Sequence, residues 1–205
     1  MATDTFSERC LIGITKSGGS EFQFAPITVY DSIDIDEGDN EKTYAATAAG
    51  GRLGTAVPRG DTVITLEMKP VGISALASYE GLSEWFYGTA ATAAYSGGTP
   101  DSGVKVQNTG VQSKFRLVLT WTTDPSASTA SGALATGYDH WRYIAVNADL
   151  VSLKLNNTGD GSLVCTAKFR VTPFGKAGNS QPAIKVQSTY GALVVLGTTW
   201  TGTYH

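Results

Sequence analysis

The chain has 205 residues, of which 41% are apolar and 16% charged, and its formal net charge is −3. A chain of this length can remove roughly 70% of its unfolded surface from water, so a single domain over residues 1–205 is expected. It has no Lys/Arg run, which argues against a protein that grips nucleic-acid phosphates. No apolar run approaches the roughly 18 residues of a membrane span, and the first residues, MATDT, lack the layout of a signal peptide. We therefore expect a chain that is made in a cytoplasm and has no membrane contact.

The low charge content is the most informative part of the composition. Soluble domains usually carry about 25% charged residues, and this chain has 16%. A surface so poor in charge favours extensive contact with other protein. The alternative is a secreted or thermophilic β domain with an uncharged, threonine-rich surface.

Strand patterns begin the chain and are followed by a long polar segment. Weak strands are expected at residues 11–15 and 22–30. Residues 31–60 are too polar and too glycine-rich for compact strands, so we expect a long inter-strand arm, which is generally functional or disordered at this length. The charged residues assigned to this assembly arm are Asp34, Asp36, Glu37, Asp39, Lys42, Arg52 and Arg59.

The clearest strand and the one helix come next. In residues 61–70, Ile64, Leu66 and Met68 alternate with more polar residues, which predicts a half-buried strand that ends at Pro70. Residues 72–88 carry apolar side chains at spacings of three and four, which predicts an amphipathic helix lying across a sheet. Its sheet-facing residues include Leu76, Leu82 and Phe86.

Alternation returns in the second half of the chain. Strands are expected at residues 115–121, 141–146, 150–155 and 163–172, with a hairpin between the last two, and weaker ones at 103–107, 183–187 and 193–200. The Ser/Ala/Thr-rich residues 126–137 predict a flexible connection. The expected fold class is mainly β, an antiparallel sandwich or barrel with one flanking helix and a long arm.

No catalytic, cofactor or metal site is expected. His140 has no nucleophile motif beside it, and we interpret it as a histidine at a loop edge. The acidic run from Asp34 resembles a calcium loop, but Ala45 stands where a bidentate Glu is needed. Cys10 and Cys165 are far apart in sequence, and we expect buried thiols, with a disulfide left open.

Aromatic clusters allow two interpretations. The run 85–87, WFY, together with Trp141 and Tyr143 could form a sugar-binding platform or could anchor a core or an interface. We favour the second.

The order of these elements resembles the major tail tube proteins of tailed viruses of bacteria and archaea. A long polar arm leads into residues 51–72, GRLGTAVPRGDTVITLEMKPVG, and a helix ends in residues 81–88, GLSEWFYG. In that family a long hairpin or loop precedes a strand of the form D-T-x-x-T-L-E-x-x-P-x-G, and one helix packs outside the sheets. The resemblance covers about a third of the chain and involves no catalytic residue.

The resemblance implies a β-sandwich whose copies form hexameric rings, with strands of all six copies lining a channel. It also implies rings stacked into a tube through the arm, contacts with other tail proteins, and viral DNA that passes through the lumen without specific binding. The protein would then belong to the virion tail. A capsid or decoration protein and a carbohydrate-binding β-sandwich module are the alternatives.

Overall fold

The computed structural model describes residues 10–18, 21–23, 29–38, 42–46, 48, 50, 52–56, 60–69, 114–157, 159, 163–172, 184–189, 191, 193 and 195–197. Within these residues the secondary structure is β. The strands are β1 Cys10–Lys16, β2 Glu21–Gln23, β3 Val29–Asp36, β4 Lys42–Ala46, β5 Arg52–Ala56, β6 Thr62–Lys69, β7 Phe115–Thr122, β8 His140–Asn157, β9 Leu163–Val171 and β10 Ile184–Thr189. The expected mainly β class is confirmed.

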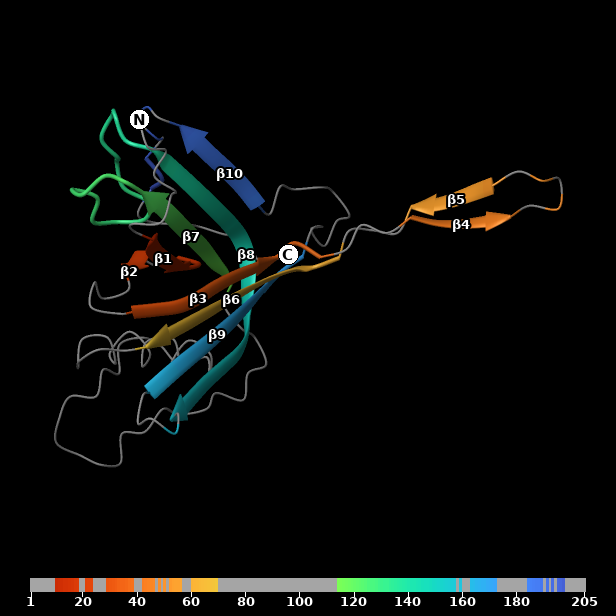
Figure 1. The fold of residues 1–205 in the computed structure, drawn as a ribbon, viewed down its shortest axis with the longest axis horizontal. Helices are drawn as coiled ribbons and strands as arrows, with labels where there is room; N and C mark the ends of the chain where they lie inside the picture. The colour runs from red at the N-terminus through yellow and green to blue at the C-terminus, as the bar shows by residue number, and fades with distance from the viewer. Residues whose placement is uncertain are drawn as a thin grey trace.

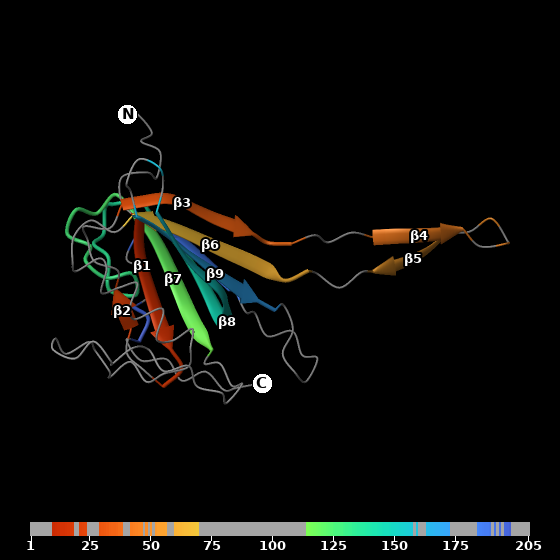
Figure 2. The same cartoon turned by 90° about the horizontal axis from the view of Figure 1, so that it is seen from below.

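Eight of the strands form one curled antiparallel sheet in the order β2-β1-β7-β8-β9-β6-β3, with β10 also paired to β8. Figure 2 shows this curl, with β3, β6, β9, β8, β7 and β1 following one another around it. The long strand β8 belongs to both halves, because residues 140–148 pair with β7 and residues 149–157 pair with β9. The sheet can therefore fold back on itself without a chain break.

A single residue in the left-handed region lies where β8 passes from one partner to the other. Asn147 has a φ of 58°, which Asn tolerates better than most residues with a side chain. The pairing of β8 is also irregular on either side, with register shifts next to β7 and next to β9. Such irregularities bend a strand. The sequence predicted two strands here, and the structure joins them into one bent strand.

The core lies inside the curl and follows the predicted alternation. Its residues come from both halves of the sheet, and buried members include Ile14, Leu66, Leu117, Tyr143 and Phe169. The alternation in β6 is regular, with buried and half-buried residues in strict succession. The prediction that Ile64, Leu66 and Met68 share the buried face is confirmed.

The other face of β7 is also buried, which alternation did not predict. Arg116, Val118 and Thr120 are each at most 6% exposed although they point away from the main core. Residues 123–139, Leu193 and residues 195–197 lie over this side, and a small apolar cluster there includes Val118, Ala130 and Ile144, with Leu196 packed against it. The sheet is therefore covered on both faces at β7.

The arm differs from its prediction in two places. Residues 31–36 are the second part of β3 and pair with β6, so the polar opening of the arm is strand and not loop. Its later part contains the antiparallel hairpin of β4 and β5, which Figures 1 and 2 both show standing away from the curled sheet.

Four other predictions remain. The predicted helix at 72–88, with Leu76, Leu82 and Phe86, and the predicted strand at 103–107 lie outside the described residues. Predicted strand 22–30 is divided between β2 and β3. Leu193, Val195 and Leu196 are not in a strand, because this segment crosses the outer face as a cover instead of pairing in the sheet.

Candidate assembly surfaces and a buried polar cluster

The root of the arm is closely fitted to the body. The Asp36 carboxylate accepts a hydrogen bond of 2.9 Å from the Gly38 backbone N–H. Gly38 has a φ of 71°, and a Cβ atom on it would lie 2.8 Å from the carbonyl oxygen of Asp61. Only glycine avoids both the strained φ and the backbone collision. Gly38 therefore allows the chain leaving β3 to run close to the chain entering β6.

The structure places part of the predicted arm set. Asp34, Asp36 and Glu37 are exposed at the end of β3. Lys42 begins β4 opposite Ala56, and Arg52 begins β5 opposite Ala46. Asp39 and Arg59 lie outside the described residues. The predicted arm residues therefore fall into two groups, one at the root of the arm and one on its hairpin.

The four strands β3-β6-β9-β8 end in two strand edges that have no partner among the described residues, and β2 and β10 have further outer edges. β3 pairs with β6 on one side, and residues 149–157 of β8 pair with β9 on one side. Backbone N–H and C=O groups along such edges are free to pair with another strand. These two edges bound the four strands β3-β6-β9-β8 on opposite sides.

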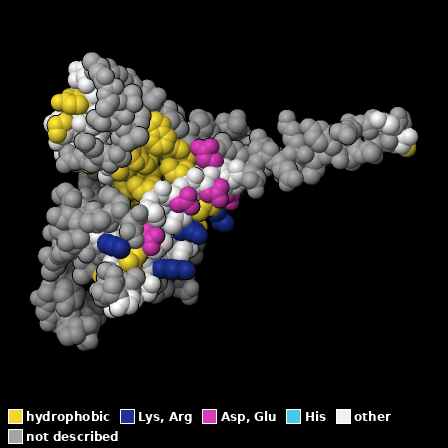
Figure 3. All heavy atoms as spheres, in the orientation of Figure 1, with side chains coloured by type: hydrophobic (Ala, Val, Ile, Leu, Met, Phe, Trp, Pro, Cys, Tyr) yellow, Lys and Arg dark blue, Asp and Glu magenta, His cyan; other side chains and the backbone are white. Residues whose placement is uncertain are grey.

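The outward face of these four strands is charged but not uniform. Exposed Asp34 and Asp36 lie on edge strand β3, while exposed Lys168 and Arg170 lie on β9 and exposed Lys154 lies on β8. Figure 3 shows acidic side chains in a row on this face, with Lys and Arg side chains beside them. Arg170 Nε is 3.7 Å from Asp61 Oδ2, a solvent-exposed pair of small energetic value. The charge changes sign across the sheet, from the β3 edge to the β8 edge.

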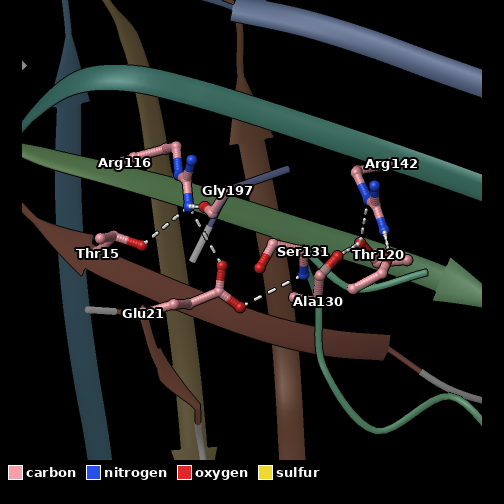
Figure 4. Close-up of polar contacts among 9 residues, drawn as sticks. Thr15, Glu21, Arg116, Thr120, Ala130, Ser131, Arg142 and Gly197 are labelled. Atoms are coloured by element: carbon pink, nitrogen blue, oxygen red, sulfur yellow. Dashed lines mark hydrogen bonds and ion pairs between the residues drawn. The ribbon is translucent and has the colours of Figure 1, made fainter. Parts of the chain in front are cut away.

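A buried ion pair lies on the opposite half of the sheet, on its outer side. Glu21 of β2, Thr15 of β1 and Arg116 of β7 form one cross-strand row. Arg116 Nη2 lies 3.5 Å from Glu21 Oε2 and donates hydrogen bonds of 3.3 Å to Thr15 Oγ1 and 2.7 Å to the Gly197 carbonyl oxygen (Figure 4). The Glu21 carboxylate lies directly over Gly13, where a Cβ atom would be 2.5 Å from Oε1.

A second buried arginine holds the segment that crosses this face. Arg142 of β8 donates from Nε to Thr120 Oγ1 at 3.1 Å and from Nη2 to the Gly132 carbonyl oxygen at 2.8 Å. Thr120 Oγ1 in turn donates to the Ala130 carbonyl oxygen at 2.7 Å, and Ser131 N–H donates to Glu21 Oε1 at 3.3 Å. Figure 4 shows these contacts side by side. The cluster ties residues 130–132 and Gly197 to three strands.

Burial and mutual charge act on both guanidinium groups. Burial lowers the pKa of Arg116, and the neighbouring Glu21 carboxylate opposes that change. Burial also lowers the pKa of Arg142, Glu21 raises it, and the charge of Arg116 lowers it further. An arginine stays protonated under such shifts, so the cluster holds two positive charges and one negative charge. Removing one member of such a group is strongly destabilising, because it leaves a buried charge less well compensated.

His140 also belongs to this covered side. It is 1% exposed, its Nε2 lies 2.8 Å from the Ala135 carbonyl oxygen, and its Nδ1 lies 2.8 Å from Thr122 Oγ1. A carbonyl oxygen only accepts, so Nε2 carries the proton. His140 is the first residue of β8, at the edge of the loop as expected, but its side chain is buried because residues 123–139 cover it.

Asp124 links two parts of the same covering segment by hydrogen bonds. Its Oδ1 accepts hydrogen bonds from the Ser126 hydroxyl at 2.6 Å and the Ser126 N–H at 2.8 Å, and its Oδ2 accepts one of 2.9 Å from the Ala135 N–H. These bonds, the Ser126 hydroxyl first, hold the pKa of Asp124 below its usual range. The predicted flexible connection at 126–137 is therefore a structured cover.

Sequence reasoning missed Glu21, Arg116 and Arg142 for a specific reason. Charged residues that alternate with apolar ones in a strand normally face water. Here the cover comes from residues distant in sequence, which local alternation cannot show. Gly13 offered one weak signal, since a glycine inside a strand often marks close approach by another group.

We also searched the described residues for a metal site, a membrane-spanning helix and a disulfide. They contain no group of three or more His, Cys, Asp and Glu side chains close enough to hold a metal ion. Over the same residues, no helix is both long and apolar enough to span a bilayer. Cys10 and Cys165 are both free thiols in the structure.

No protein-family model matches the chain, and no curated protein sequence matches it. Solved structures do match it. The PVC sheath/tube terminator of an extracellular contractile injection system, in its extended state, is 12% identical, with a TM-score of 0.48 over 88% of this chain and 94% of that one. The PVC sheath-tube complex in the extended state gives 13% identity and a TM-score of 0.44 over 87% of this chain and 88% of that one.

A further match is Hcp1 from Flavobacterium johnsoniae, at 12% identity and a TM-score of 0.33 over 89% of this chain and 98% of that one. At these identities the likeness is one of fold.

Proposed function

We propose that this chain is a structural subunit, without enzymatic activity, that assembles with its own copies into rings which stack to form a tube. The observation that supports this most is the pair of open strand edges on opposite sides of four antiparallel strands. A subunit with two different open edges can join copies head to tail, and such contacts close into a ring if the rotation between copies permits.

The projecting hairpin of β4 and β5 could contact copies in another ring, in addition to the contacts within one ring. β4 and β5 pair with each other and stand away from the sheet (Figure 1). An isolated two-stranded hairpin is marginally stable in water, so it needs contacts from outside. We propose that the predicted arm of residues 31–60, apart from residues 31–36 in β3, is an assembly arm on a single domain of residues 1–205, and that the arm bridges successive rings.

The details of the proposed assembly follow from the tail tube resemblance of the sequence. They are a hexameric ring, a place in the virion tail after assembly in the host cytoplasm, contacts with other tail proteins, and a lumen through which viral DNA passes. A net charge of −3 without a basic run suits a lumen that does not grip phosphates.

The carbohydrate-binding alternative needs aromatic side chains open to solvent on one face. Trp121 and Trp141 are half-buried, their rings are 4.5 Å apart, and both pack against the main core. This packing supports a core role for them.

Negative-stain imaging and sedimentation of the purified chain test the proposal. We expect rings or tubes without added ligand. A variant in which a short Gly-containing turn replaces residues 39–59 should keep the fold and form rings that do not stack. Trypsin should cut the free subunit at Lys42, Arg52 or Arg59, and the assembled form should resist. A compact monomer at high concentration, or normal tubes from the shortened variant, would contradict the proposal.

A further inference from the structure

We propose that the open edge of β3 in one copy pairs with the open edge of residues 149–157 of β8 in the next copy, in a register that sets Asp34 opposite Lys154. This inference rests on the proposed self-assembly and identifies the residues that make the contact specific. The partner is a second copy of this chain.

The direction of the contact follows from the sheet. Neighbouring strands in β3-β6-β9-β8 are antiparallel, so β3 and β8 at its two edges run in opposite directions. If a rotation about an axis along the strands carries one copy onto the next, β8 of one copy runs antiparallel to β3 of the other. The junction then continues the antiparallel hydrogen-bonding pattern.

The polar side chains of the two edges complement each other. On the outward face, β3 presents Ser32, Asp34 and Asp36, and β8 presents Lys154 and Asn156, all five exposed. With Asp34 opposite Lys154, antiparallel counting sets Ser32 opposite Asn156. Opposite charges that face each other across two strands stabilise their pairing.

The apolar side chains complement each other in the same register. Ile33 and Ile35 of β3 are half-buried at the margin of the core. The register sets Ile33 opposite Leu155, which is 46% exposed, and Ile35 opposite the half-buried Leu153. The described residues have four exposed large hydrophobic side chains, and Val151 and Leu155 on this part of β8 are two of them. Exposed aliphatic groups gathered at one edge mark a contact surface.

Pairing of like edges is disfavoured by the same charges. Two β3 edges would bring Asp34 and Asp36 of one copy against those of the other, and two β8 edges would bring lysine against lysine. Like charges directly opposite across two strands are destabilising. The edges therefore select a head-to-tail contact over a two-fold dimer.

Charge reversal provides the test. Lys154→Asp and Asp34→Lys should each raise the concentration needed for half-assembly by about tenfold, and the double variant should return it close to the original value. Lys168→Asp is the matched control, because Lys168 is exposed on the same face but lies on the inner strand β9. We expect the Lys168→Asp variant to assemble at the same concentration as the original chain. Thermal midpoints of the separate subunits should show that all variants fold.

A second measurement reads the register without changing any charge. Ser32→Cys combined with Asn156→Cys should form a disulfide between copies under mild oxidation. Ser32→Cys combined with Ser152→Cys should not, because four residues along a strand separate the second pair by roughly 13 Å.

The outcomes separate this contact from the wider proposal. If rings form and Lys154→Asp behaves like Lys168→Asp, or if the second cysteine pair links instead of the first, the edge contact is wrong while the tube subunit stands. If the unaltered chain never assembles, both fail.

Discussion

Glu21 on β2 and Arg116 on β7 face each other across Thr15 of β1, with 3.5 Å between Oε2 and Nη2 and side-chain exposures of 3% and 7%. The pair links two strands that are far apart in sequence. Through Ser131 and Gly197 it also fastens the two segments that cover the sheet.

The first prediction concerns this pair. Glu21→Gln should lower the free energy of unfolding by about 3–5 kcal/mol, because it removes the buried carboxylate that opposes the charge of two buried guanidinium groups. Urea denaturation measures the change. Glu67→Gln is the control, since Glu67 is half-buried and its bond to the Ser32 hydroxyl is exposed, so the change there should be under about 1 kcal/mol. If Glu21→Gln and Glu67→Gln lower the free energy of unfolding equally, the buried ion pair contributes no more to stability than the exposed hydrogen bond.

The second prediction is a dependence on pH. The pKa of Asp124 is lower in the folded chain than in the unfolded one, so its contribution to stability is complete above the unfolded pKa of about 4 and is lost as the pH falls through the folded value. Asp124→Asn should therefore lower the thermal midpoint at pH 7, and the gap from the original chain should narrow towards pH 3. Asp139→Asn, at an exposed position of the same segment, should leave the profile unchanged. A constant gap across that range would contradict the assignment.

The third prediction concerns the root of the arm. Gly38→Ala should destabilise the chain more than Gly18→Ala, although the two glycines have φ angles of 71° and 78°. Both variants lose about 1–2 kcal/mol from the left-handed backbone. Only Gly38 would also push a Cβ atom against the Asp61 carbonyl oxygen, while Gly18 has open space. Denaturation of both variants checks the difference, and equal losses would show that the root is not closely fitted.

The fourth prediction concerns the thiols. Burial raises the pKa of Cys10 to about 12 and that of Cys165 to about 11, so few thiolates exist at pH 8. Because the thiolate is the reactive form, a thiol reagent should react slowly with the native chain and rapidly with both cysteines in urea. A native burst of one or two equivalents would show exposed thiols. The absence of any reaction in urea without reductant would reveal a disulfide.

The fifth prediction tests the bend in β8. Asn147→Gly should retain or slightly raise stability, because glycine adopts the φ of 58° without strain. Asn147→Val should cost about 1–2 kcal/mol or more, since a β-branched residue is poorly suited to that region. If the two variants unfold at the same denaturant concentration, β8 does not depend on this conformation.

Alternation alone was enough to locate β6, the core face of β7, and β9. In these strands every second residue is apolar, and a period of two places those residues on one face whatever the neighbouring strands are. The hairpin of β8 and β9 was also predictable, because residues 156–161, NNTGDG, are rich in residues that favour turns. The low charge content of the chain predicted self-assembly from composition alone, without any knowledge of strand pairing.

Tertiary structure decided what covers the sheet and which strand edges have no partner among the described residues. Arg116 and Arg142 read as surface residues until residues 123–139 and Gly197 are placed over them, and that placement depends on contacts between distant segments. The acidic run at Asp34 likewise read as a solvated loop, whereas pairing with β6 turns it into one side of a strand edge. Alternation in the sequence determines only which face of the sheet each strand residue points to. Whether that face is buried or exposed depends on which distant segments of the chain pack against it.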